Sequence, residues 1–499
     1  MQAPTRRPHA ALAATLSFLF PGLGQAYAGD MRLAAILAAP VVLLVVGVAV
    51  PVAFLGDRLR NTVLSASFLV AILVLDVALL GWRLFAVAHA GLVNRPPALS
   101  TSGAYASGGA ASVSVAGDRR SASTLAIVAA LLIATVVMHA WVGVIITSLN
   151  SALGQVFVGG LPLASSSASA QPLNEPEYHW DGTERITFLL LGIDSGPNRT
   201  EALTDTIMVV SIDPVKRTAL MISVPRDTGF LPLPDRSIFA DGRYPDKVNA
   251  ITTVAARNPR LWCPDLNNGP ECGIRTLERS VGLYLGIPIH YYATVDLVGF
   301  EHMIDAVGGV ELCLPGQLAD PTYTGPGISG RGVRLPEGCH PYNGADALAY
   351  SRIRKGILEL PNGTREPQDD FKRAARQQQV LLALRAKFAS TNLVFGLPPL
   401  LSAVGETVKT DFPRELAGDL ASLLPLITGP DIKRVVLGLP EFTDPPINPT
   451  ANYLLIPKRA AIRSEMQRLL GAGTPLQGWY LGTTDPYPPR TAATPSPSP

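Results

Sequence analysis

The sequence predicts a layered α/β domain with a mixed sheet, preceded by an all-α transmembrane region. Two observations carry this prediction. Short apolar strand patterns alternate with helical patterns from residue 184 to residue 390, as in domains whose sheet is covered by helices. Hydrophobic residues make up 47% of the chain and charged residues only 16%, which is unusual for a soluble protein. We therefore expect part of the chain to lie in lipid.

Three almost wholly apolar stretches lie at about residues 33–55, 63–88 and 125–149. Each is long enough for the ~20 residues that cross a bilayer as a helix. Residues 1–150 are therefore expected to form a multi-span membrane anchor. Asp76 interrupts the second stretch and His139 the third. For both we expect snorkelling or an interhelical hydrogen bond rather than a functional site.

An earlier apolar run, residues 10–28, is interrupted by Pro21 and by two glycines, Gly22 and Gly24. Because proline and glycine break the helical hydrogen-bond ladder, an uninterrupted spanning helix is not expected. A re-entrant or interfacial hairpin fits the pattern. The alternative is a cleaved signal peptide, which the closely following apolar stretches disfavour.

Basic residues predict the orientation of the anchor. The arginines expected on one side of the membrane are Arg6, Arg7, Arg32, Arg95, Arg119 and Arg120. Because cytoplasmic loops carry an excess of Lys and Arg, the N-terminus and the Ser/Gly-rich loop 91–123 are expected in the cytoplasm. Arg58 and Arg60, in the short loop 56–62 expected between the first two spans, oppose this mildly. The chain after the third span is then extracytoplasmic.

All four cysteines lie in that later part of the chain: Cys263, Cys272, Cys313 and Cys339. They lack the paired spacing of a zinc site. Two disulfides are one interpretation and would suit an oxidising compartment. Four buried free thiols are the other, and the connectivity cannot be read from the spacing.

Composition divides the rest of the chain. Residues 151–183 are rich in Gly, Ser, Ala and Pro and are expected to form a flexible linker. A catalytic domain spans residues 184–390, and its C-terminal part continues through residues 391–475. The Pro/Ser/Thr-rich tail, residues 476–499, is expected to be disordered.

The elements of the folded part follow from apolar periodicity. Strands are predicted at 185–191, 206–212, 218–224, 290–295, 310–314 and 435–439, and helices at 274–285, 297–307 and 457–470. The second and third strands form a hairpin around residues 213–216. Asn343 caps a helix through Tyr350, and Asp369 or Asp370 starts a long helix to about residue 389.

Two aspartates, Asp194 and Asp205, lie at strand ends, where loops present functional groups. Two carboxylates from neighbouring loops, completed by water and substrate phosphates, are a usual way to hold Mg²⁺. Either residue alone is more often a turn former. Together with the arginines that follow, the pair favours a metal site.

Cationic residues follow in three groups: Arg226 beside Asp227, then Arg352 and Arg354, then Arg373 and Arg376 with Gln377. An arginine fork matches phosphate oxygens bidentately. Arg352 and Arg354 point to one face if their segment is extended. A solvated salt-bridge face is the alternative, but it does not explain several arginines near so few acids. Lys247 and Asn249 could add donors, although an ordinary turn explains them nearly as well.

Several function classes lack support in the sequence. The motifs G-x-S-x-G and G-x-x-x-x-G-K-[ST] are absent, as is a zinc-ligand spacing, which disfavours serine hydrolases, P-loop NTPases and zinc proteases. The net charge is only +2. Without a basic stripe or a helix-turn-helix pattern, no nucleic-acid partner is expected.

Seven segments occur in this order: LLLGIDS, TDTIMVVSID, SVPRDT, DKVNAI, YYATVDLVGFEHMIDAVGGVEL, GADALAYSRIRKG and DDFKRAARQQQVLLAL. Together they resemble the LytR-CpsA-Psr family of bacterial cell-envelope proteins over residues 184–390, with a weaker tail to about residue 470. The resemblance implies a three-layer α/β/α sandwich outside the cytoplasmic membrane. It also implies a phosphotransferase that moves a glycan polymer from a polyprenyl-pyrophosphate carrier to peptidoglycan, with Mg²⁺ on the pyrophosphate.

The resemblance assigns roles to single residues. Asp194 and Asp205 would bind Mg²⁺, and the pyrophosphate would contact Arg226, Arg352, Arg354, Arg373 and Gln377, with Lys247 and Asn249 as neighbours. Phosphoryl transfer requires charge neutralisation and in-line positioning more than a covalent nucleophile. The expected catalytic residues are Arg226, Asp227 and Asp205. The proton acceptor is left open between Asp227 and a metal-bound carboxylate.

Three features depart from the family pattern. Leu203 stands where many members have an arginine, so Arg199 is expected to reach the phosphate instead. The connector 355–369 is longer than usual and could form a lid or an acceptor-specific loop. The anchor has several spans where one is common.

The lipid contact and the function each leave alternatives open. Two apolar helix faces, Leu277 with Val281 and Leu285, and Val380 with Leu381 and Leu384, could wall a tunnel for the polyprenyl chain, but such faces are more often core. A polyprenyl-pyrophosphate hydrolase is the second enzymatic interpretation. A non-enzymatic regulatory protein that binds the lipid pyrophosphate is the third.

Overall fold

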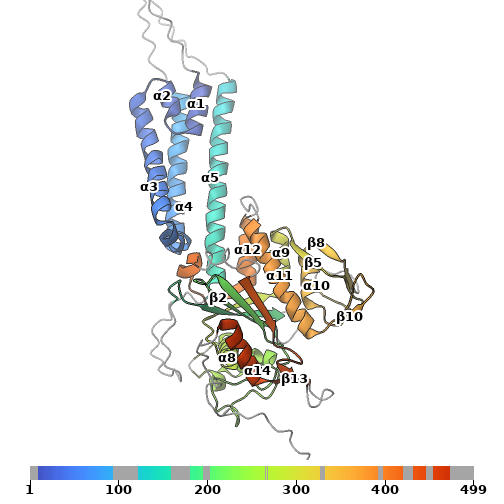
Figure 1. The fold of residues 1–499 in the computed structure, drawn as a ribbon. Helices are drawn as coiled ribbons and strands as arrows, with labels where there is room; N and C mark the ends of the chain where they lie inside the picture. The colour runs from blue at the N-terminus through green and yellow to red at the C-terminus, as the bar shows by residue number, and fades with distance from the viewer. Residues whose placement is uncertain are drawn as a thin grey trace, which may run out of the picture. The chain divides into compact units, whose positions relative to one another are not determined.

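The computed structural model describes residues 9–93, 122–158, 180–194, 203–264, 266, 268–325, 332–390, 397–419, 431–445 and 453–471. The chain divides into two compact units, Met1–Asn150 and Ser151–Pro499, and each is considered by itself (Figure 1). Arg199, the tail 476–499, and most of the predicted loop 91–123 and linker 151–183 lie outside the described residues.

Helices make up the described part of the first unit: α1 (Ala10–Leu19), α2 (Leu23–Tyr27), α3 (Met31–Leu64), α4 (Ala66–Ala88), the π-helix η1 (His89–Val93) and α5 (Ala122–Val156), which ends in the second unit. The run at residues 10–28 is a helical hairpin, because Gly22 adopts φ = 100° between α1 and α2. A buried polar network fixes it. Ser17 Oγ donates to Gln25 Oε1 at 2.9 Å, and Gln25 Nε2 donates to the Ala86 carbonyl at 2.9 Å.

The turn between α3 and α4 differs from the sequence prediction. The expected loop 56–62 is helical, and the chain reverses at Ser65 instead. Ser65 is an N-cap whose hydroxyl accepts from Phe68 N at 3.3 Å, and a serine cap satisfies a free helix-terminal N–H. The expected interhelical hydrogen bond is present, since His139 Nδ1 lies 2.7 Å from Asp76 Oδ1.

Two helical stretches of this region, Ala66–Leu92 and Ala122–Val156, are long and apolar enough to cross a membrane. The other expected span lies in α3, whose described side chains include the shorter apolar stretch Met31–Val46. Apolar side chains point outward along one face of α4, where Val70, Val74 and Val77 are more than half exposed. An outward apolar face of this kind is unusual for a protein in water.

The second unit is built on a six-stranded sheet in the order β11 (Val408–Thr410), β4 (Tyr291–Asp296), β1 (Ile186–Asp194), β2 (Leu203–Asp213), β3 (Thr218–Ser223) and β12 (Ile432–Val436). The sheet is mixed, as predicted: β4 and β1 pair in parallel, as do β3 and β12, while the other neighbours are antiparallel. The predicted β2–β3 hairpin is closed by Asp213 Oδ1, which accepts from Lys216 N at 2.8 Å.

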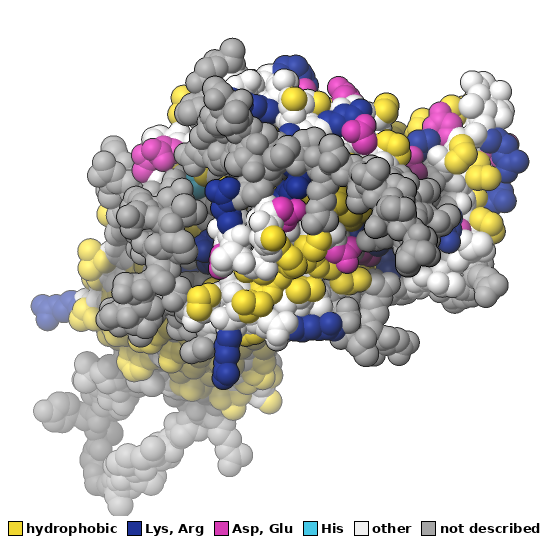
Figure 2. Space-filling view, turned by 90° about the horizontal axis from the view of Figure 1, so that it is seen from below, with side chains coloured by type: hydrophobic (Ala, Val, Ile, Leu, Met, Phe, Trp, Pro, Cys, Tyr) yellow, Lys and Arg dark blue, Asp and Glu magenta, His cyan; other side chains and the backbone are white. Residues whose placement is uncertain are grey.

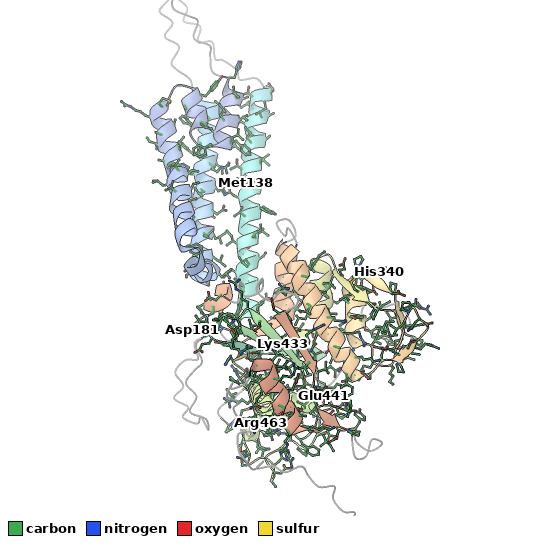
Figure 3. The ribbon with its side chains drawn as sticks, viewed as in Figure 1. Met138, Asp181, His340, Lys433, Glu441 and Arg463 are labelled. Atoms are coloured by element: carbon green, nitrogen blue, oxygen red, sulfur yellow. A yellow bond between two sulfur atoms is a disulfide. The ribbon has the colours of Figure 1, made fainter. Side chains whose placement is uncertain are left out.

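Helices cover both faces of the sheet, which confirms the three-layer α/β/α sandwich (Figure 1). One layer contains η2 (Val248–Ala250), α6 (Ile251–Arg257), α7 (Pro259–Trp262), α8 (Gly269–Leu285) and α14 (Arg459–Leu470). The other contains α9 (Leu297–Ala306), α10 (Gly344–Arg352) and α11 (Asp370–Ser390), with α12 (Leu397–Thr407) packed on α9. Lys433 of β12 donates to the Leu469 carbonyl of α14 at 3.3 Å and so ties sheet to helix (Figure 3).

Smaller elements lie beside the sandwich. They are a four-stranded sheet of β10 (Arg365–Pro367), β9 (Ile357–Glu359), β6 (Gln317–Asp320) and β7 (Val333–Leu335), the pairs β5 (Val310–Leu314) with β8 (Gly338–Tyr342) and β13 (Thr443–Asp444) with β14 (Ile456–Pro457), and the 3₁₀ helix η3 (Arg414–Leu416). The connector 355–369 therefore contains a β-hairpin, β9–β10, that pairs with β6 rather than an irregular loop.

The four cysteines form two disulfides, Cys263–Cys272 and Cys313–Cys339. The first closes the segment before α8, and the second joins residues that face each other across β5 and β8. The structure thus selects the disulfide interpretation over the free-thiol interpretation.

Candidate active site

A cavity of 350 Å³ opens between the sheet and the helical layer formed by α9 and α11. Its wall contains residues from elements that are far apart in the sequence: β1, β2 and β4 of the sheet, α9, α10 and α11 of the helical layer, and the end of β6 with the segment after it. The sandwich therefore brings the two halves of the predicted site together.

One end of the cavity is polar and predominantly cationic. The residues there are Asp205, Arg352, Arg354, Lys355, Arg373 and Gln377. Asp205 lies on β2, the two neighbouring arginines at the end of α10, and Arg373 and Gln377 one turn apart on α11. Lys355 was not predicted, because nothing in the sequence distinguishes it from a surface lysine.

Most of the remaining lining is apolar, although Thr206, Asp320, Thr322, Tyr323, Thr324 and Ser351 add polar groups. The apolar residues include Leu190, Met208, Val295, Leu297, Phe300, Met303, Val380, Leu381 and Leu384. For the apolar face of α11, the sequence left open a choice between core packing and a wall for the lipid chain. Val380 and Leu384 are buried in the core and also face the cavity, so core packing alone does not describe this face. Core packing does describe the α8 face, because Leu277, Val281 and Leu285 are fully buried on the opposite side of the sheet.

Arg226 and Asp205 form the closest ion pair of the site. Arg226 Nη1 donates to Asp205 Oδ1 at 2.7 Å, and both side chains are at least four-fifths buried. Burial alone would raise the pKa of Asp205, but Arg226, Arg373 and Arg354 outweigh it and hold that pKa below its ordinary value. Asp205 therefore remains ionised, and an ionised carboxylate can bind either a guanidinium or a metal ion.

Arg373 and Asp370 extend this pair from the start of α11. Arg373 Nη2 donates to the Asp205 backbone carbonyl at 3.0 Å and lies 3.1 Å from Asp370 Oδ1. Asp370 Oδ1 is also 3.7 Å from Arg226 Nε. Burial raises the pKa of Asp370 despite Arg373 and Arg226, and Asp227 adds to the rise. The sequence identified Asp370 only as a helix start, although its position one turn before Arg373 was a usable signal.

Asp227 is held by Lys247, whose Nζ lies 2.7 Å from Asp227 Oδ1. The neighbouring Asn249 is buried, and its backbone N–H donates to the Arg226 carbonyl at 3.4 Å. Neither Lys247 nor Asn249 lines the cavity. Lys247 therefore neutralises an acid of the site, and Asn249 supports the backbone beneath Arg226.

Arg352 and Arg354 both line the cavity, as expected of ligand-binding residues. The extended segment that was predicted to point them to one face is absent. Their segment is not extended, because Arg352 is the last residue of α10 and the chain turns at Ile353. Arg354 is exposed and makes no hydrogen bond or ion pair within the part of the chain that the structure describes. Its charge is thus available to a ligand.

Arg376 does not line the cavity, and its guanidinium binds backbone carbonyls at the end of α10. It is buried, and Nε donates to the Tyr350 carbonyl at 2.8 Å. The other guanidinium nitrogens donate to the Ile353 carbonyl and to Gln368 Oε1. Burial lowers the pKa of Arg376 to about 10. The side chain fixes the end of α10, from which Arg352 and Arg354 project.

The predicted metal ligands come from the paired strands β1 and β2. Asp194 ends β1, and its backbone pairs with Leu203 at the start of β2, two residues before Asp205. Carboxylate oxygens are suitable ligands for Mg²⁺, which usually takes one or two carboxylates and completes its shell with water and phosphate. The described residues contain no group of three or more His, Cys, Asp or Glu side chains that could hold a metal ion. A metal ion at this site would therefore need ligands from water or phosphate.

The LytR_cpsA_psr family model matches residues 163–437, more than half of the chain and all of this site's cavity. The chain belongs to the LytR-CpsA-Psr family. Among its relatives is the polyisoprenyl-teichoic acid–peptidoglycan teichoic acid transferase TagU of Bacillus anthracis, 28% identical over 238 residues. That match covers 48% of this chain and 64% of TagU, so the chain spans less than two thirds of that relative.

Another relative of this family member is the regulatory protein MsrR of Staphylococcus aureus (strain COL), 30% identical over 233 residues, covering 46% of this chain and 57% of MsrR. Solved structures that resemble the chain include B. subtilis TagV, with 23% identity and a TM-score of 0.42 over 58% of this chain and 98% of TagV. TagT bound to LIIa-WTA has 22% identity and a TM-score of 0.41 over 61% of this chain and 98% of TagT.

Proposed function

We propose that the chain is a membrane-anchored phosphotransferase that moves a glycan polymer from a polyprenyl-pyrophosphate carrier to peptidoglycan in the bacterial cell envelope. The observation that carries this proposal is the two-part cavity, which joins a cationic end to an apolar interior. A polyprenyl pyrophosphate has the same two parts. The TagU relative, whose name describes transfer from a polyisoprenyl carrier to peptidoglycan, supports the same activity.

The ligand is oriented by this division of the cavity. The polyprenyl chain lies between sheet and helices, against Met208, Phe300 and Leu381. Burial of apolar surface contributes roughly 25 cal/mol per Å² to binding. The pyrophosphate then lies at the cationic end, where arginine forks bind phosphate oxygens. Arg352, Arg354 and Arg373 supply these forks, Arg226 lies directly behind Asp205, and Gln377 offers an uncharged donor.

The reaction proposed here is attack of a sugar hydroxyl of peptidoglycan on the phosphorus that carries the glycan. Such a transfer depends on positioning and on fixed charges that stabilise the transition state. The arginines hold the two phosphates and stabilise the charge that develops on the leaving polyprenyl phosphate. Mg²⁺, held by Asp194 and Asp205 in this proposal, supplies further charge neutralisation when it is bound.

Membrane attachment suits a lipid-linked substrate. The helices that contain Ala66–Leu92 and Ala122–Val156 are of spanning length, and their outward faces are apolar. The arginines near the N-terminus favour a cytoplasmic N-terminus. The catalytic domain is then extracytoplasmic, where its two disulfides are favoured by the oxidising conditions.

Turnover with and without acceptor tests this proposal. The full chain in detergent is supplied with a polyprenyl-pyrophosphate-linked glycan, Mg²⁺ and peptidoglycan fragments, and the released polyprenyl phosphate is measured. We expect release that requires the fragments and leaves the glycan phosphate attached to them. Release at the same rate without fragments would identify a hydrolase. Binding of the lipid without any release would favour a regulatory role.

A further inference from the structure

Asp370 lies beside the cavity rather than in its wall. It is the first residue of α11, and its side chain is 21% exposed. Asp205 and Arg373 line the cavity, whereas Asp370 and Arg226 do not. Asp370 Oδ1 is 3.1 Å from Arg373 Nη2 and 3.7 Å from Arg226 Nε, so Asp370 contacts the charged groups of the site from outside the cavity wall.

This position matters for the direction of attack. In phosphoryl transfer the attacking and leaving oxygens lie roughly in line on opposite sides of the phosphorus. Under the proposed function the leaving group is polyprenyl phosphate, whose chain occupies the apolar interior. The acceptor hydroxyl must then approach from the opposite side of the arginine cluster, where its proton needs a receiving group within hydrogen-bond reach.

Two other acids of the site are already committed to cations. Asp227 is bound by Lys247 at 2.7 Å, and Asp205 is bound by Arg226 at 2.7 Å. Asp370 Oδ2 accepts from Arg373 Nη2 at 3.3 Å, but its Oδ1 is buried and accepts no hydrogen bond from the described residues. The Oδ1 atom of Asp370 is therefore a buried carboxylate oxygen that can accept a proton without breaking a hydrogen bond.

The titratable groups that face Asp370 come from four parts of the chain. Arg226 and Asp227 follow β3, Arg354 follows α10, Arg373 lies on the same helix, and Tyr453 lies in the segment before β14. Burial is the largest influence on the carboxyl and raises its pKa; the arginines oppose the rise and Asp227 reinforces it. A carboxylate with a raised pKa is a stronger base than an ordinary aspartate.

We propose that Asp370 accepts the proton of the attacking hydroxyl; this inference rests on the proposed function. The acceptor O–H bond breaks, and its proton moves to the Asp370 carboxylate. The acceptor oxygen uses the freed electron pair to bond the glycan-bearing phosphorus. The bond from that phosphorus to the bridging oxygen breaks, and its electron pair leaves on polyprenyl phosphate. Asp370 then returns the proton to water.

The test is the pH dependence of turnover in three variants of the full chain in detergent. The probe is a polyprenyl-pyrophosphate-linked disaccharide with a peptidoglycan fragment as acceptor. Asp370→Asn removes the base, and Asp370→Glu restores a carboxylate. Asp369→Asn is the matched control, because Asp369 is an exposed neighbour whose Oδ1 accepts from Lys372 N at 2.7 Å and asparagine caps equally well.

For Asp370→Asn we expect kcat to fall by about 10²–10⁴-fold, the usual range for loss of a general base, with little change in KM for the lipid. The fall in rate on the acidic side of the wild-type profile should disappear in Asp370→Asn and persist in Asp370→Glu and Asp369→Asn. An Asp370→Asn variant that keeps the wild-type profile, or that changes KM and kcat together, would overturn the inference. A wild-type chain without turnover would instead overturn the proposed function and this inference with it.

Discussion

Arg226 Nη1 and Asp205 Oδ1 are 2.7 Å apart at the polar end of the cavity, and Asp370 Oδ1 lies 3.7 Å from the same guanidinium. One arginine thus connects two carboxyl groups whose pKa values shift in opposite directions. The pKa of Asp205 is lowered, because burial is outweighed by Arg226 and two further arginines. The pKa of Asp370 is raised, because burial outweighs its arginine neighbours.

These shifts predict opposite effects on stability. A carboxyl with a lowered folded pKa stabilises the fold above its unfolded pKa, and this contribution is lost as the pH falls through the folded value. A carboxyl with a raised folded pKa contributes stability only at low pH, and it loses that contribution as the pH rises through the folded value. At pH 7, Asp205→Asn should therefore lower the unfolding midpoint, and Asp370→Asn should raise it.

Thermal unfolding of the two variants and the wild type between pH 3 and pH 8 checks this prediction. The difference for Asp370→Asn should shrink as the pH falls toward about 4, near the ordinary pKa of an aspartate. The difference for Asp205→Asn should persist at that pH and shrink only at lower pH, because its folded pKa is lowered. Asp235→Asn is a control, because Asp235 lies in the loop after β3 and accepts from nearby Ser237. Shifts of the same sign for both variants at pH 7 would show that the carboxyl environments have been misassigned.

Arg376 should matter for stability and for substrate use, although it does not line the cavity. Arg376→Met leaves the carbonyls of Tyr350 and Ile353 without their donor, at about 1–3 kcal/mol for each buried group left unpaired. The end of α10 is then free to shift, and displacement of positioning groups by about 1 Å can cost 10²-fold in rate. We expect lower stability and a higher KM for the lipid.

Lys372→Met on the same helix is the comparison for Arg376→Met, since Lys372 is 39% exposed and pairs with Glu366. Its unfolding midpoint and KM should stay close to the wild type, because surface ion pairs contribute about 0–1 kcal/mol. Equal effects of both substitutions would remove the special role given to Arg376.

The apolar interior should select for the lipid chain. Leu381→Trp places a larger ring where the cavity wall is only partly buried. We expect KM to rise at least about tenfold for a long polyprenyl chain, equivalent to about 1.4 kcal/mol of lost binding, and to change little for a chain of two isoprene units. Competition assays with lipids of graded length measure this. Val215→Trp, on the exposed β2–β3 turn, should leave all chain lengths unaffected.

Both disulfides should be present in protein extracted from the cell envelope. Alkylation before and after reduction, followed by peptide mass mapping, should find Cys263 joined to Cys272 and Cys313 joined to Cys339. Loss of a native disulfide costs 2–5 kcal/mol in small secreted domains, so the Cys313→Ser variant should unfold earlier by a measurable margin. Four alkylated thiols before reduction would contradict both the pairing and the extracytoplasmic placement.

The fold was largely predictable because its signals are local. Apolar runs and turn residues predicted β1, β2 and β3 within a few residues, and Asn343 caps α10 as expected, with its side chain accepting from Asp346 N at 2.8 Å. The α3–α4 turn was placed wrongly because the polar residues between two apolar stretches suggested a loop at 56–62, whereas the helix continues to Leu64 and a serine cap sets the reversal. Long helices tolerate isolated glycine at about 1 kcal/mol.

The candidate site was predictable in composition but not in contacts. The sequence identified Asp205, Arg226 and Arg373, yet it could not show that Arg376 faces the α10 carbonyls while Arg373 faces the sheet. Helix periodicity sorts residues by face, but long-range packing decides which neighbour each face meets. Asp370 was missed for the same reason, since its contact with Arg226 joins positions that are far apart in the sequence.

Seen from below, hydrophobic side chains gather between scattered Lys, Arg, Asp and Glu side chains, without a continuous field of one sign on that face (Figure 2). A protein that binds nucleic acid commonly presents a basic stripe. On the face seen in this view, the described Lys and Arg side chains do not form such a stripe.

The most direct test of the central claim is turnover of a polyprenyl-pyrophosphate-linked glycan by the wild type and by Arg226→Ala, with Arg468→Ala as the matched control on the exposed face of α14. Loss of the fixed charge that pairs with Asp205 at the cationic end should slow release of polyprenyl phosphate by at least about 10²-fold. Arg468→Ala should match the wild type. Wild-type turnover in Arg226→Ala would contradict the account of this cavity as the site of phosphoryl transfer.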